Sequence, residues 1–530
     1  MTIFQGTFVG AGAGRLSSAW STDLRQLHYR FRTDAGAADA SPTWGAVEDQ
    51  SYYPGSSNFR LRMQLLNAGA VVAQPWELYV SKNGGAYAPV TTVLANGVQS
   101  VDAGASADDT QVLVPRLYPF ESTADWTLSG ASVDLDFAGN RIYPWSAAFA
   151  DFLSISRAST GYAKDSKGSL ISFGTDTLRI TDLGLLIEDA RTNIVLYSAI
   201  TTLPVNWSDL GADKGAATTA PDGTNTAQID SRNTAATNHG MYQTYTTTAA
   251  AWTSSIYLKA NGYNYGSLVV RGSVKSQTIV ADLTTGVITS TNSQGSPTNV
   301  STGTEVLANG WVRLWITMDL AAESTLIGAF MSDAAVPSGG YSNAIPVFTS
   351  PATDGVGFIV WGFQMEAGSF VSSYIPTTAI SATRAADSIT LGGLLQTTIA
   401  AATGTIVSQI GNSEGSNFAA NIVDSNGTNI VGFDATNHGL ASLIATLATG
   451  NTANRSTIDD KLGLAWSAAG RSLVLNNGTI VTDASAQTPS STQKLGSASG
   501  TSNFIYAYVK RISAWNSKLA DATLQGFTAP

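Results

Sequence analysis

The sequence predicts an all-β protein with several β-sandwich domains of jelly-roll type in series, preceded by an N-terminal immunoglobulin-like β-domain. Charged residues make up only 12% of the 530 residues, whereas surface helices normally depend on Lys and Glu. Asn-Gly occurs six times and Asp-Gly twice, mostly between short β-prone runs. These pairs adopt positive φ at low cost, as type I′ hairpin turns require. Frequent hairpin turns between short strands are typical of sandwiches and jelly rolls.

Residues 1–120 form the predicted N-terminal domain. Apolar and basic residues alternate over Leu27–Arg32 and Phe59–Leu65, which predicts strands with one face on a core. The other face then carries Arg30, Arg32, Arg60 and Arg62. Arginine favours bidentate pairing with carboxylates, so this face is interpreted as a docking surface for a partner protein. A solvated sheet face is the alternative.

The rest of the chain divides into three further parts. Residues 121–183 contain several prolines and are interpreted as a connector with a few strands. Residues 184–386 and 387–530 are predicted to form a second and a third β-domain. Strands are expected at Ser254–Lys259, Ser267–Val270, Trp311–Met318, Gly357–Trp361 and Ser472–Leu475. A short helix is expected over 518–527, with Leu519, Ala522 and Leu524 against the sheet.

Composition excludes several functional classes. The net charge is −10 and no part of the chain is basic, which argues against nucleic-acid binding. Apolar runs of about 18 residues are absent from the sequence, so no membrane insertion is expected. The first residues lack the features of a secretory signal, and synthesis in a cytoplasm is expected. The chain has no cysteine and three widely spaced histidines, which leaves little material for thiolate or histidine metal sites.

The sequence predicts no enzyme and no catalytic residues. Gly411–Gly415 matches the G-x-S-x-G nucleophile pattern, but that pattern needs a following helix, and Asn417–Val423 is predicted to be a strand. A glycosidase needs two carboxyl groups facing each other across a cleft. Carboxylates close in sequence seldom meet that requirement and are interpreted as solvated, capping or ion-paired groups: Asp108/Asp109, Asp134/Asp136, Glu188/Asp189 and Asp459/Asp460.

No cofactor is predicted, although a calcium ion stays open. Asp424–Gly427 is similar to the start of a calcium loop, but Ala435 stands where an EF-hand needs a bidentate Glu. A looser calcium site, made of loop carbonyls and one or two aspartates, is the alternative that remains. No metal-ligating residues are assigned from the sequence.

Aromatic residues in the second domain are the candidates for ligand binding. Sugar binding by a sandwich uses exposed aromatic rings together with amide hydrogen bonds. The turn at Asn261–Tyr265 would present two tyrosines beside an amide. The predicted glycan-binding residues are Tyr263, Asn264, Tyr265, Tyr242 and Tyr245, with Trp207 and Trp252 as further candidates. The alternative for each aromatic ring is a place in the core, where most aromatics of a β-sandwich lie.

Eight segments of the second domain occur in an order that resembles a known family. They are Leu185–Asn193, Ala220–Thr224, Ser255–Ala260, Ala281–Gly286, Asn309–Arg313, Trp361–Gly368, Ser373–Thr377 and Thr383–Asp387. The series resembles the carbohydrate-binding-module-like domain of bacteriophage tail and fibre structural proteins, and Ser154–Thr160 resembles its lead-in. The third domain resembles a concanavalin A-like, laminin-G-like sandwich over Ser472–Asp483, Lys494–Gly496 and Tyr506–Leu519.

The resemblance implies a fibre or spike protein of a phage particle, located on its head or tail. The N-terminal domain would anchor it to other virion proteins, and the lectin-like domains would adhere to host surface polysaccharide. A homo-oligomer, specifically a trimer, is expected from the resemblance. The sequence predicts no extended β-helix of the kind that polysaccharide-degrading tailspikes carry. The alternative is a purely structural head-decoration or tail component that contacts only other virion proteins.

Overall fold

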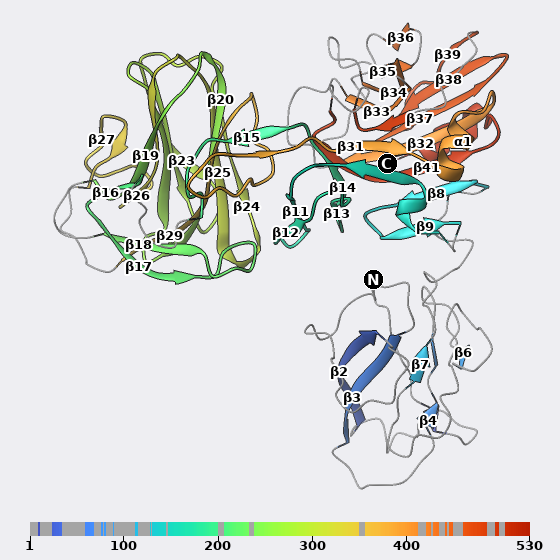
Figure 1. Ribbon diagram of the computed structural model, residues 1–530, viewed down its shortest axis with the longest axis horizontal. Helices are drawn as coiled ribbons and strands as arrows, with labels where there is room; N and C mark the ends of the chain where they lie inside the picture. The colour runs from blue at the N-terminus through green and yellow to red at the C-terminus, as the bar shows by residue number, and fades with distance from the viewer. Residues whose placement is uncertain are drawn as a thin grey trace. The chain divides into compact units, whose positions relative to one another are not determined.

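The computed structural model describes most of the chain beyond residue 127 (Figure 1). The described residues are 128, 130–144, 147–199, 206–232, 238–348, 356–411, 459–484, 493–497 and 504–529, together with the backbone of strands β1–β7 and β33–β36. The chain divides into two compact units. One comprises residues 1–129 and 142–147, and the other comprises residues 130–141 and 148–530.

The first unit is described only by short strands. β2 (Leu24–Thr33), β3 (Phe59–Asn67) and β7 (Val112–Val114) form one sheet, and β1 (Val9–Gly10) with β4 (Trp76–Glu77) and β5 (Tyr79–Val80) with β6 (Ala88–Pro89) form two ladders. The register pairs Arg30 with Arg62 and Arg32 with Arg60. Their side chains lie outside the described residues, and the docking role stays a prediction. So does the immunoglobulin-like assignment of residues 1–120.

Residues 191–384 hold a β-sandwich of two six-stranded antiparallel sheets, here called the inserted sandwich. Its first sheet runs β16 (Ser208–Leu210), β19 (Gly240–Thr246), β26 (Ser324–Ser332), β21 (Tyr265–Arg271), β22 (Ser276–Asp282) and β23 (Ile288–Gln294). Its second sheet runs β17 (Ala212–Thr218), β18 (Ala227–Arg232), β29 (Gly357–Ala367), β20 (Ala250–Asn261), β25 (Trp311–Leu320) and β24 (Ser301–Val306).

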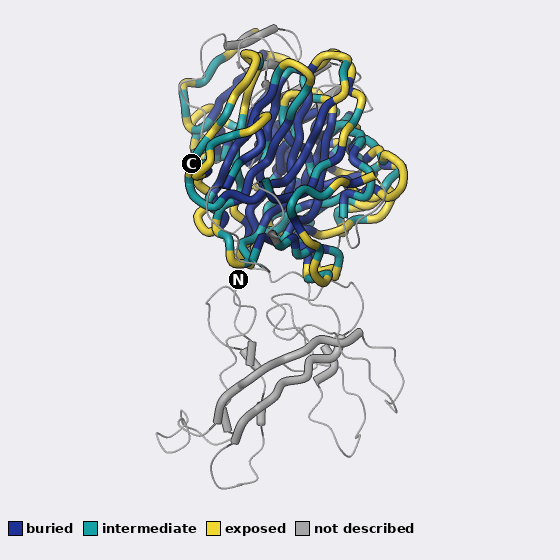
Figure 2. Tube along the Cα trace, turned by 90° about the vertical axis from the view of Figure 1, so that its left-hand side faces the viewer, coloured by how far each residue is buried: buried dark blue, intermediate teal, exposed yellow. Residues whose placement is uncertain are grey.

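The core of the inserted sandwich lies between these two sheets. Alternate residues point inward from each strand, such as Leu268 and Val270 from β21 and Ile327 and Ala329 from β26, and all are buried. Figure 2 shows the strands buried through the middle of the sandwich and the loops exposed at its ends. Removing a fully buried Leu or Ile side chain from water contributes about 1.5–3 kcal/mol, so this core stabilises the sandwich.

A second sandwich, here called the flanking sandwich, is formed by residues on both sides of the inserted one. Its larger sheet runs β13 (Ile180–Thr181), β14 (Gly184–Ile187), β41 (Ala507–Trp515), β32 (Gly404–Gly411), β37 (Asp459–Ser467), β38 (Gly470–Leu475) and β39 (Val481–Asp483), and β8 (Val133–Asp136) also pairs with β41. Its other sheet runs β10 (Leu153–Ser156), β31 (Ser388–Leu391), β40 (Gln493–Leu495), β33 (Ala420–Ser425), β34 (Thr428–Phe433), β35 (Leu440–Ser442) and β36 (Ala445–Ala448).

The two sandwiches are therefore nested in the chain. Residues 121–183, expected to be a connector with a few strands, supply β8, β10 and β13 to the flanking sandwich, which also takes β14 from the predicted second domain. The sequence does not show that these strands belong to a sandwich, because they are short and because β8 reads Val-Asp-Leu-Asp. Both of its aspartates are buried and ion-paired, Asp134 with Arg511 and Asp136 with Arg141. A buried strand can therefore look like a polar segment in the sequence.

Short elements complete the described structure. β11 (Gly161–Lys164) pairs with β12 (Leu170–Phe173), β15 (Arg191–Asn193) with β30 (Ala382–Arg384), and β27 (Tyr341–Ser342) with β28 (Ile345–Pro346); β9 spans Arg141–Tyr143, and single 3-10 turns span Phe149–Asp151 and Ala308–Gly310. The α-helices are α1 (Gly393–Ile399) and α2 (Asp521–Phe527). Leu524 of α2 is buried as expected, whereas Ala522 is exposed, contrary to expectation. Neither helix of the described residues is long and apolar enough to cross a bilayer.

A buried ionic cluster holds the junction where the chain enters and leaves the inserted sandwich. Arg157 Nη1 lies 2.9 Å from Asp387 Oδ1, and Arg179 pairs with both Asp387 and Glu188. Arg384 Nη1 lies 3.2 Å from Glu188 Oε2. Burial would raise the pKa of Glu188, but the guanidinium groups of Arg384 and Arg179 lower it to about 2. The prediction of an all-β protein of several sandwiches is thus confirmed, and ionic contacts fix two of them together.

Candidate functional site

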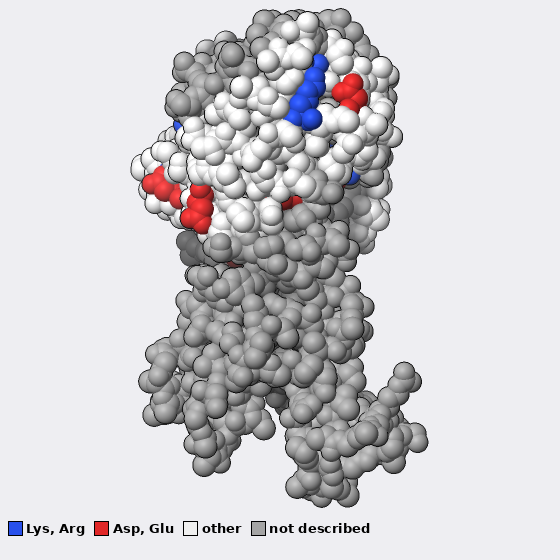
Figure 3. All heavy atoms as spheres, turned by 90° about the vertical axis from the view of Figure 1, so that its right-hand side faces the viewer, with Lys and Arg blue, Asp and Glu red and all other residues white. Residues whose placement is uncertain are grey.

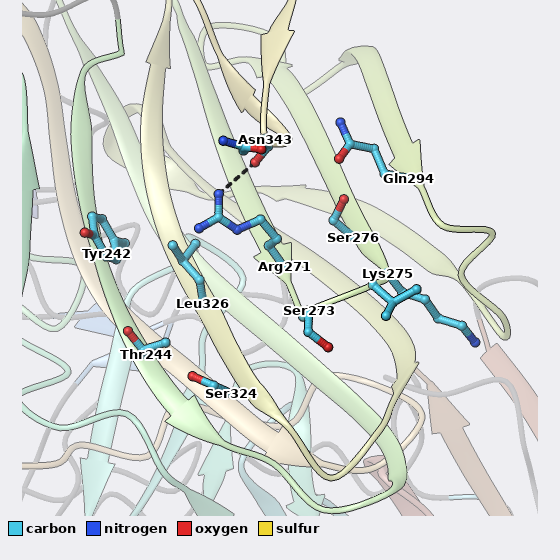
Figure 4. Close-up of a pocket in the computed structure, with 12 residues that line it drawn as sticks. Tyr242, Thr244, Arg271, Ser273, Lys275, Ser276, Gln294, Ser324, Leu326 and Asn343 are labelled. Carbon is cyan, nitrogen blue, oxygen red and sulfur yellow. Dashed lines mark hydrogen bonds between the residues drawn. The ribbon is translucent and has the colours of Figure 1, made fainter.

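The outer face of the first sheet is only partly covered. Ala344 and Ile345, which lie in the segment with β27 and β28, pack on Val269 and Phe330 of this face. Beyond that contact the described residues leave a groove of about 500 Å³ on this face, here called the Arg271 groove (Figure 4). Its lining is Tyr242, Thr244, Arg271, Gly272, Ser273, Val274, Lys275, Ser276, Gln294, Ser324, Leu326 and Asn343.

Strand register brings residues from five strands into one row across the groove. Thr244 pairs with Leu326, Leu326 with Arg271, Arg271 with Ser276, and Ser276 with Gln294. Residues directly opposite one another on antiparallel strands project from the same face of the sheet. The neighbours of Arg271 and Leu326 along their strands, Val270 and Ile327, point into the core. The row therefore lies on the outer side of the sheet. Thr244 and Gln294 are exposed and Arg271 is half-buried, whereas Leu326 and Ser276 are buried beneath their neighbours.

The adjacent row supplies the aromatic wall. Tyr242 pairs with Gly328, and Gly328 pairs with Val269. A Cβ atom on Gly328 would lie 2.9 Å from Tyr242 Cβ and 2.8 Å from Met241 O, so a side chain cannot be added there without movement. The Tyr242 ring is half-buried and stacks on Phe330, with 6.4 Å between ring centroids. The glycine thus gives the tyrosine room to lie on the sheet at the side of the groove.

Arg271 lies at the centre of the groove and is oriented by one neutral acceptor. Its Nη1 donates to the carbonyl oxygen of Asn343 at 3.0 Å. Figure 4 shows the guanidinium between Tyr242 and Leu326 on one side and Ser276 and Gln294 on the other. Among the described residues Arg271 has no carboxylate within ion-pairing distance, and no Asp or Glu belongs to the groove lining. The arginine therefore offers unused N–H donors at the groove.

The β21–β22 hairpin closes one end of the groove. Gly272 N donates to Lys275 O at 2.9 Å, and Ser273 N donates to Glu323 Oε2 at 2.7 Å. Burial acts to raise the pKa of Glu323, but hydrogen bonds from Ser273 outweigh it and lower that pKa. Lys275 points away from Arg271 in Figure 4, and its Nζ donates to Thr298 Oγ1 at 3.3 Å. Glu323 thus binds both the backbone N–H and the hydroxyl of Ser273 and borders the groove without lining it.

The chemistry of the groove is that of binding. It combines an aromatic ring, an apolar side chain and many neutral donors and acceptors, which is the pattern that fixes a polar organic ligand. In the described part of the chain, no group of three or more His, Asp or Glu residues is placed to hold a metal ion. His239, the histidine that lies in that part, is buried, with Nδ1 against Gly211 O and its ring against Phe348.

The five residues predicted to bind a glycan do not come together. Tyr242 lines the Arg271 groove. Tyr245 lies on the opposite face of β19, where it packs against the core and its hydroxyl accepts a hydrogen bond from Leu196 N at 3.1 Å. Tyr263, Asn264 and Tyr265 lie at the start of β21, whereas Arg271 ends it, so about 20 Å of strand separates them. Their glycan contacts stay predictions.

The two tryptophan candidates belong to the core. Trp207 and Trp252 are only 4% and 7% exposed and lie in the cluster between the two sheets. The indole Nε1 of Trp207 donates to Leu196 O at 3.0 Å, and that of Trp252 donates to Thr248 O at 2.9 Å. Both polar atoms are satisfied within the sandwich, so these two rings take the alternative position, in the core.

Sequence reasoning missed Arg271, the central residue of the groove. The signal that could have found it is the run Leu268–Ser276, in which an arginine and a lysine flank a Gly-Ser-Val turn directly after an apolar strand. Its four partners in the row come from other strands, up to 55 residues away in the sequence. Only the register of the folded sheet reveals that they share one face.

The sequence analysis listed carboxylates that lie close together in the sequence. Those among them that the structure describes are held in structural contacts. Asp134 accepts hydrogen bonds from Arg511 Nε and Ser513 Oγ, both at 2.8 Å. Asp459 pairs with Lys510 at 2.6 Å, and Asp460 accepts a bond from Asn476 Nδ2 at 2.8 Å. Asp108, Asp109 and residues 412–415 of the G-x-S-x-G pattern lie outside the described residues. The Asp424 loop lies outside them as well, apart from strand backbone.

Comparisons with known proteins give only distant structural similarity. No family model matches the chain, and no curated protein matches it. Among solved structures, the CBM40 module of a Ruminococcus gnavus IT-sialidase bound to α2,3-sialyllactose is 16% identical, covers 25% of this chain and 86% of its own, and has a TM-score of 0.20. A Trypanosoma rangeli sialidase in complex with sialic acid is 9% identical, covers 94% and 76%, and scores 0.21. Domains LG4-5 of mouse laminin α1 are 9% identical, cover 52% and 84%, and score 0.13. Values this low say nothing about function.

Proposed function

We propose that this protein binds a carbohydrate in the Arg271 groove of the inserted sandwich. The observation that carries the proposal is the row Thr244–Leu326–Arg271–Ser276–Gln294, which runs beside the Tyr242 ring on an open part of the sheet. A sugar ring has an apolar face and a rim of hydroxyl groups. The half-buried Tyr242 ring suits the face, and the hydroxyl and amide groups of Thr244 and Gln294 suit the rim.

The affinity of one groove is expected to be modest. Each neutral hydrogen bond contributes only about 0.5–1.5 kcal/mol after the loss of bonds to water. The groove is open to solvent, so water competes with a ligand for its polar groups. Display in several copies raises the strength of attachment without any new contact, because the second binding event becomes intramolecular. An adhesin on a particle can therefore use a weak individual site.

The biological setting is proposed from the family resemblance. The protein would be a fibre or spike of a phage particle. It would be made in the host cytoplasm and would assemble as a homo-oligomer, in the form of a trimer. Its N-terminal domain would dock on other virion proteins through Arg30, Arg32, Arg60 and Arg62. The sandwiches would then hold the host's surface polysaccharide without cleaving it.

Retention of the purified full chain on surface polysaccharide tests this proposal. The polysaccharide comes from a bacterium to which particles carrying the protein adsorb, and its chain length is followed in the same experiment. Retention should fall at least tenfold for Tyr242→Ala, because the stacking surface is lost. Tyr265→Ala, at the other end of β21, should leave retention unchanged.

Each other outcome contradicts a part of the proposal. Loss of retention in Tyr265→Ala but not in Tyr242→Ala would move the site to the Asn261–Tyr265 turn. Shortened polysaccharide chains would show an enzyme. If the unmutated full chain is folded, as its cooperative melting shows, and is still not retained, the result would favour a structural component that contacts only other virion proteins.

A further inference from the structure

The Arg271 groove has a charge opposite in sign to that of the protein. The whole chain carries a net charge of −10, yet the groove lining contains Arg271 and Lys275 and neither Asp nor Glu. Glu323, the nearby acid, is bonded to Ser273 of the hairpin loop. A guanidinium that has no carboxylate partner within an acidic protein can bind an anionic group of a ligand.

We propose that the ligand of the groove is an acidic sugar whose carboxylate binds Arg271. This inference rests on the proposed glycan binding and specifies the class of glycan. The guanidinium presents its N–H groups in a planar fork that matches a carboxylate with two parallel hydrogen bonds. Arg271 uses one Nη1 bond to Asn343 O, which fixes the plane of the group and leaves other donors for the ligand.

The neighbours of Arg271 place the rest of the sugar. Tyr242 and Leu326 lie on one side of the guanidinium, and Ser276 and Gln294 lie on the other (Figure 4). With the carboxylate at Arg271, the ring would lie over Tyr242. The ring hydroxyls would then reach Thr244 and Ser324, which line the same side of the groove. A free carboxylate without a sugar ring would leave these groups unused.

Carboxyl reduction of the ligand gives a matched test. The probes are oligosaccharides that contain hexuronic or sialic acids, each paired with its reduced form, in which CH2OH replaces the carboxylate. Binding to the full chain is measured by calorimetry. At least one acidic probe should bind about tenfold to a hundredfold more tightly than its reduced form, the usual effect of one charge-assisted pair.

Variants of the full chain assign that preference to Arg271. Arg271→Gln should abolish the preference for the acidic form, and Arg271→Lys should restore only part of it because the fork is lost. Lys167→Gln, which removes an exposed cation outside the groove, should keep the preference. The preference should also decrease as sodium chloride rises from 50 to 500 mM, since salt screens an open site. Melting curves confirm that each variant is folded.

The outcomes separate this inference from the proposed function. If acidic and reduced probes bind equally and Tyr242→Ala weakens both, the result would support the glycan site and contradict the preference for an acidic sugar. An acid preference that survives Arg271→Gln would also overturn it. Competition by acetate as strong as by free glucuronate would show a carboxylate site without sugar recognition. No binding of any probe, with no effect of Tyr242→Ala on polysaccharide retention, would overturn the proposed function itself.

Discussion

At the residue scale, the strongest local constraint is the buried ionic cluster at the junction of the two sandwiches. Asp387 accepts hydrogen bonds from Arg157, Arg179 and the backbone N–H of Glu188, and none of these side chains is exposed beyond 1%. Ions this deeply buried are stable only when each charge is paired. Glu188, Ser373, Arg384 and Asp387 lie in three of the eight segments that carry the family resemblance. In this structure their contacts join the sandwiches.

Removing one charge from this cluster should cost far more than removing one from a surface pair. Asp387→Ala leaves the buried Arg157 without its acid and removes one of the two acids that pair with Arg179. The free energy of unfolding should fall by about 3–5 kcal/mol. Glu305→Gln, which breaks the partly exposed pair with Lys164, should cost less than about 1 kcal/mol. Urea unfolding of the full chain measures both. Equal small losses in the two variants would contradict the structural role of the cluster.

Asp230 gives the inserted sandwich a pH-dependent term in its stability. Its carboxylate is fully buried, and burial raises its pKa to about 6 despite the ion pair with Lys214 at 2.7 Å. The folded state therefore holds this proton more tightly than the unfolded state, whose pKa is near 3.8. Stability from this group is present below about pH 4 and is lost as pH rises to about 6.

The corresponding measurement is thermal unfolding between pH 4 and 7 for the natural protein and for Asp230→Asn. The loss across this range should be about 3 kcal/mol at most for a group with this pKa. The variant should show a smaller loss because it has no proton to release. A variant with the same pH profile as the natural protein would show that Asp230 titrates normally.

At the element scale, the nested topology makes the early strands part of the flanking sandwich. β8 pairs with β41, β10 pairs with β31, and β13 pairs with β14. A fragment of residues 184–530 would lack all three and would also lack Arg157 and Arg179. It would expose the edges of β41 and β31, and exposed edges promote association with other chains.

Two fragments test this dependence. Residues 184–530 should aggregate or melt at least 10 °C below the matching transition of the full chain, whereas residues 130–530 should melt with it. The expected difference follows because a loss of about 1 kcal/mol shifts the melting temperature of a domain of this size by a few degrees. A monomeric 184–530 fragment with an unchanged melting temperature would contradict the observed strand pairing as a source of stability.

Sequence reasoning recovered the long strands because their signals are local. The predicted runs at 254–259, 267–270, 311–318, 357–361 and 472–475 all lie within strands. Asn309 and Gly310 have φ of 65° and 77°, as their turn chemistry predicts. The strands of two to four residues in 133–187 carry too few residues for a period to show. The row through Arg271 depends on the register of five strands, which no single stretch of the sequence reveals. Tyr242 was predicted from its residue type alone, as an aromatic side chain that could stack on a sugar.

At the scale of the whole molecule, two features suit an adhesive role. The entry and exit of the inserted sandwich lie side by side, since β15 pairs with β30 through Thr192 and Thr383, so the insertion does not interrupt the flanking sandwich. Charged side chains are sparse among the described residues on the face that Figure 3 presents, in keeping with the 12% charged composition. A surface that relies on neutral polar groups makes an isolated arginine in a groove a strong local determinant of binding.

Hydrogen–deuterium exchange of the full chain, with and without the bound surface polysaccharide, tests the central claim most directly. The account predicts that the ligand slows exchange in the β21–β22 hairpin over 271–276 and at the start of β26 over 324–328, which border the Arg271 groove. The turn at 261–265 should exchange at an unchanged rate. Protection at that turn or in the flanking sandwich, with none around Arg271, would contradict the assignment of the binding site.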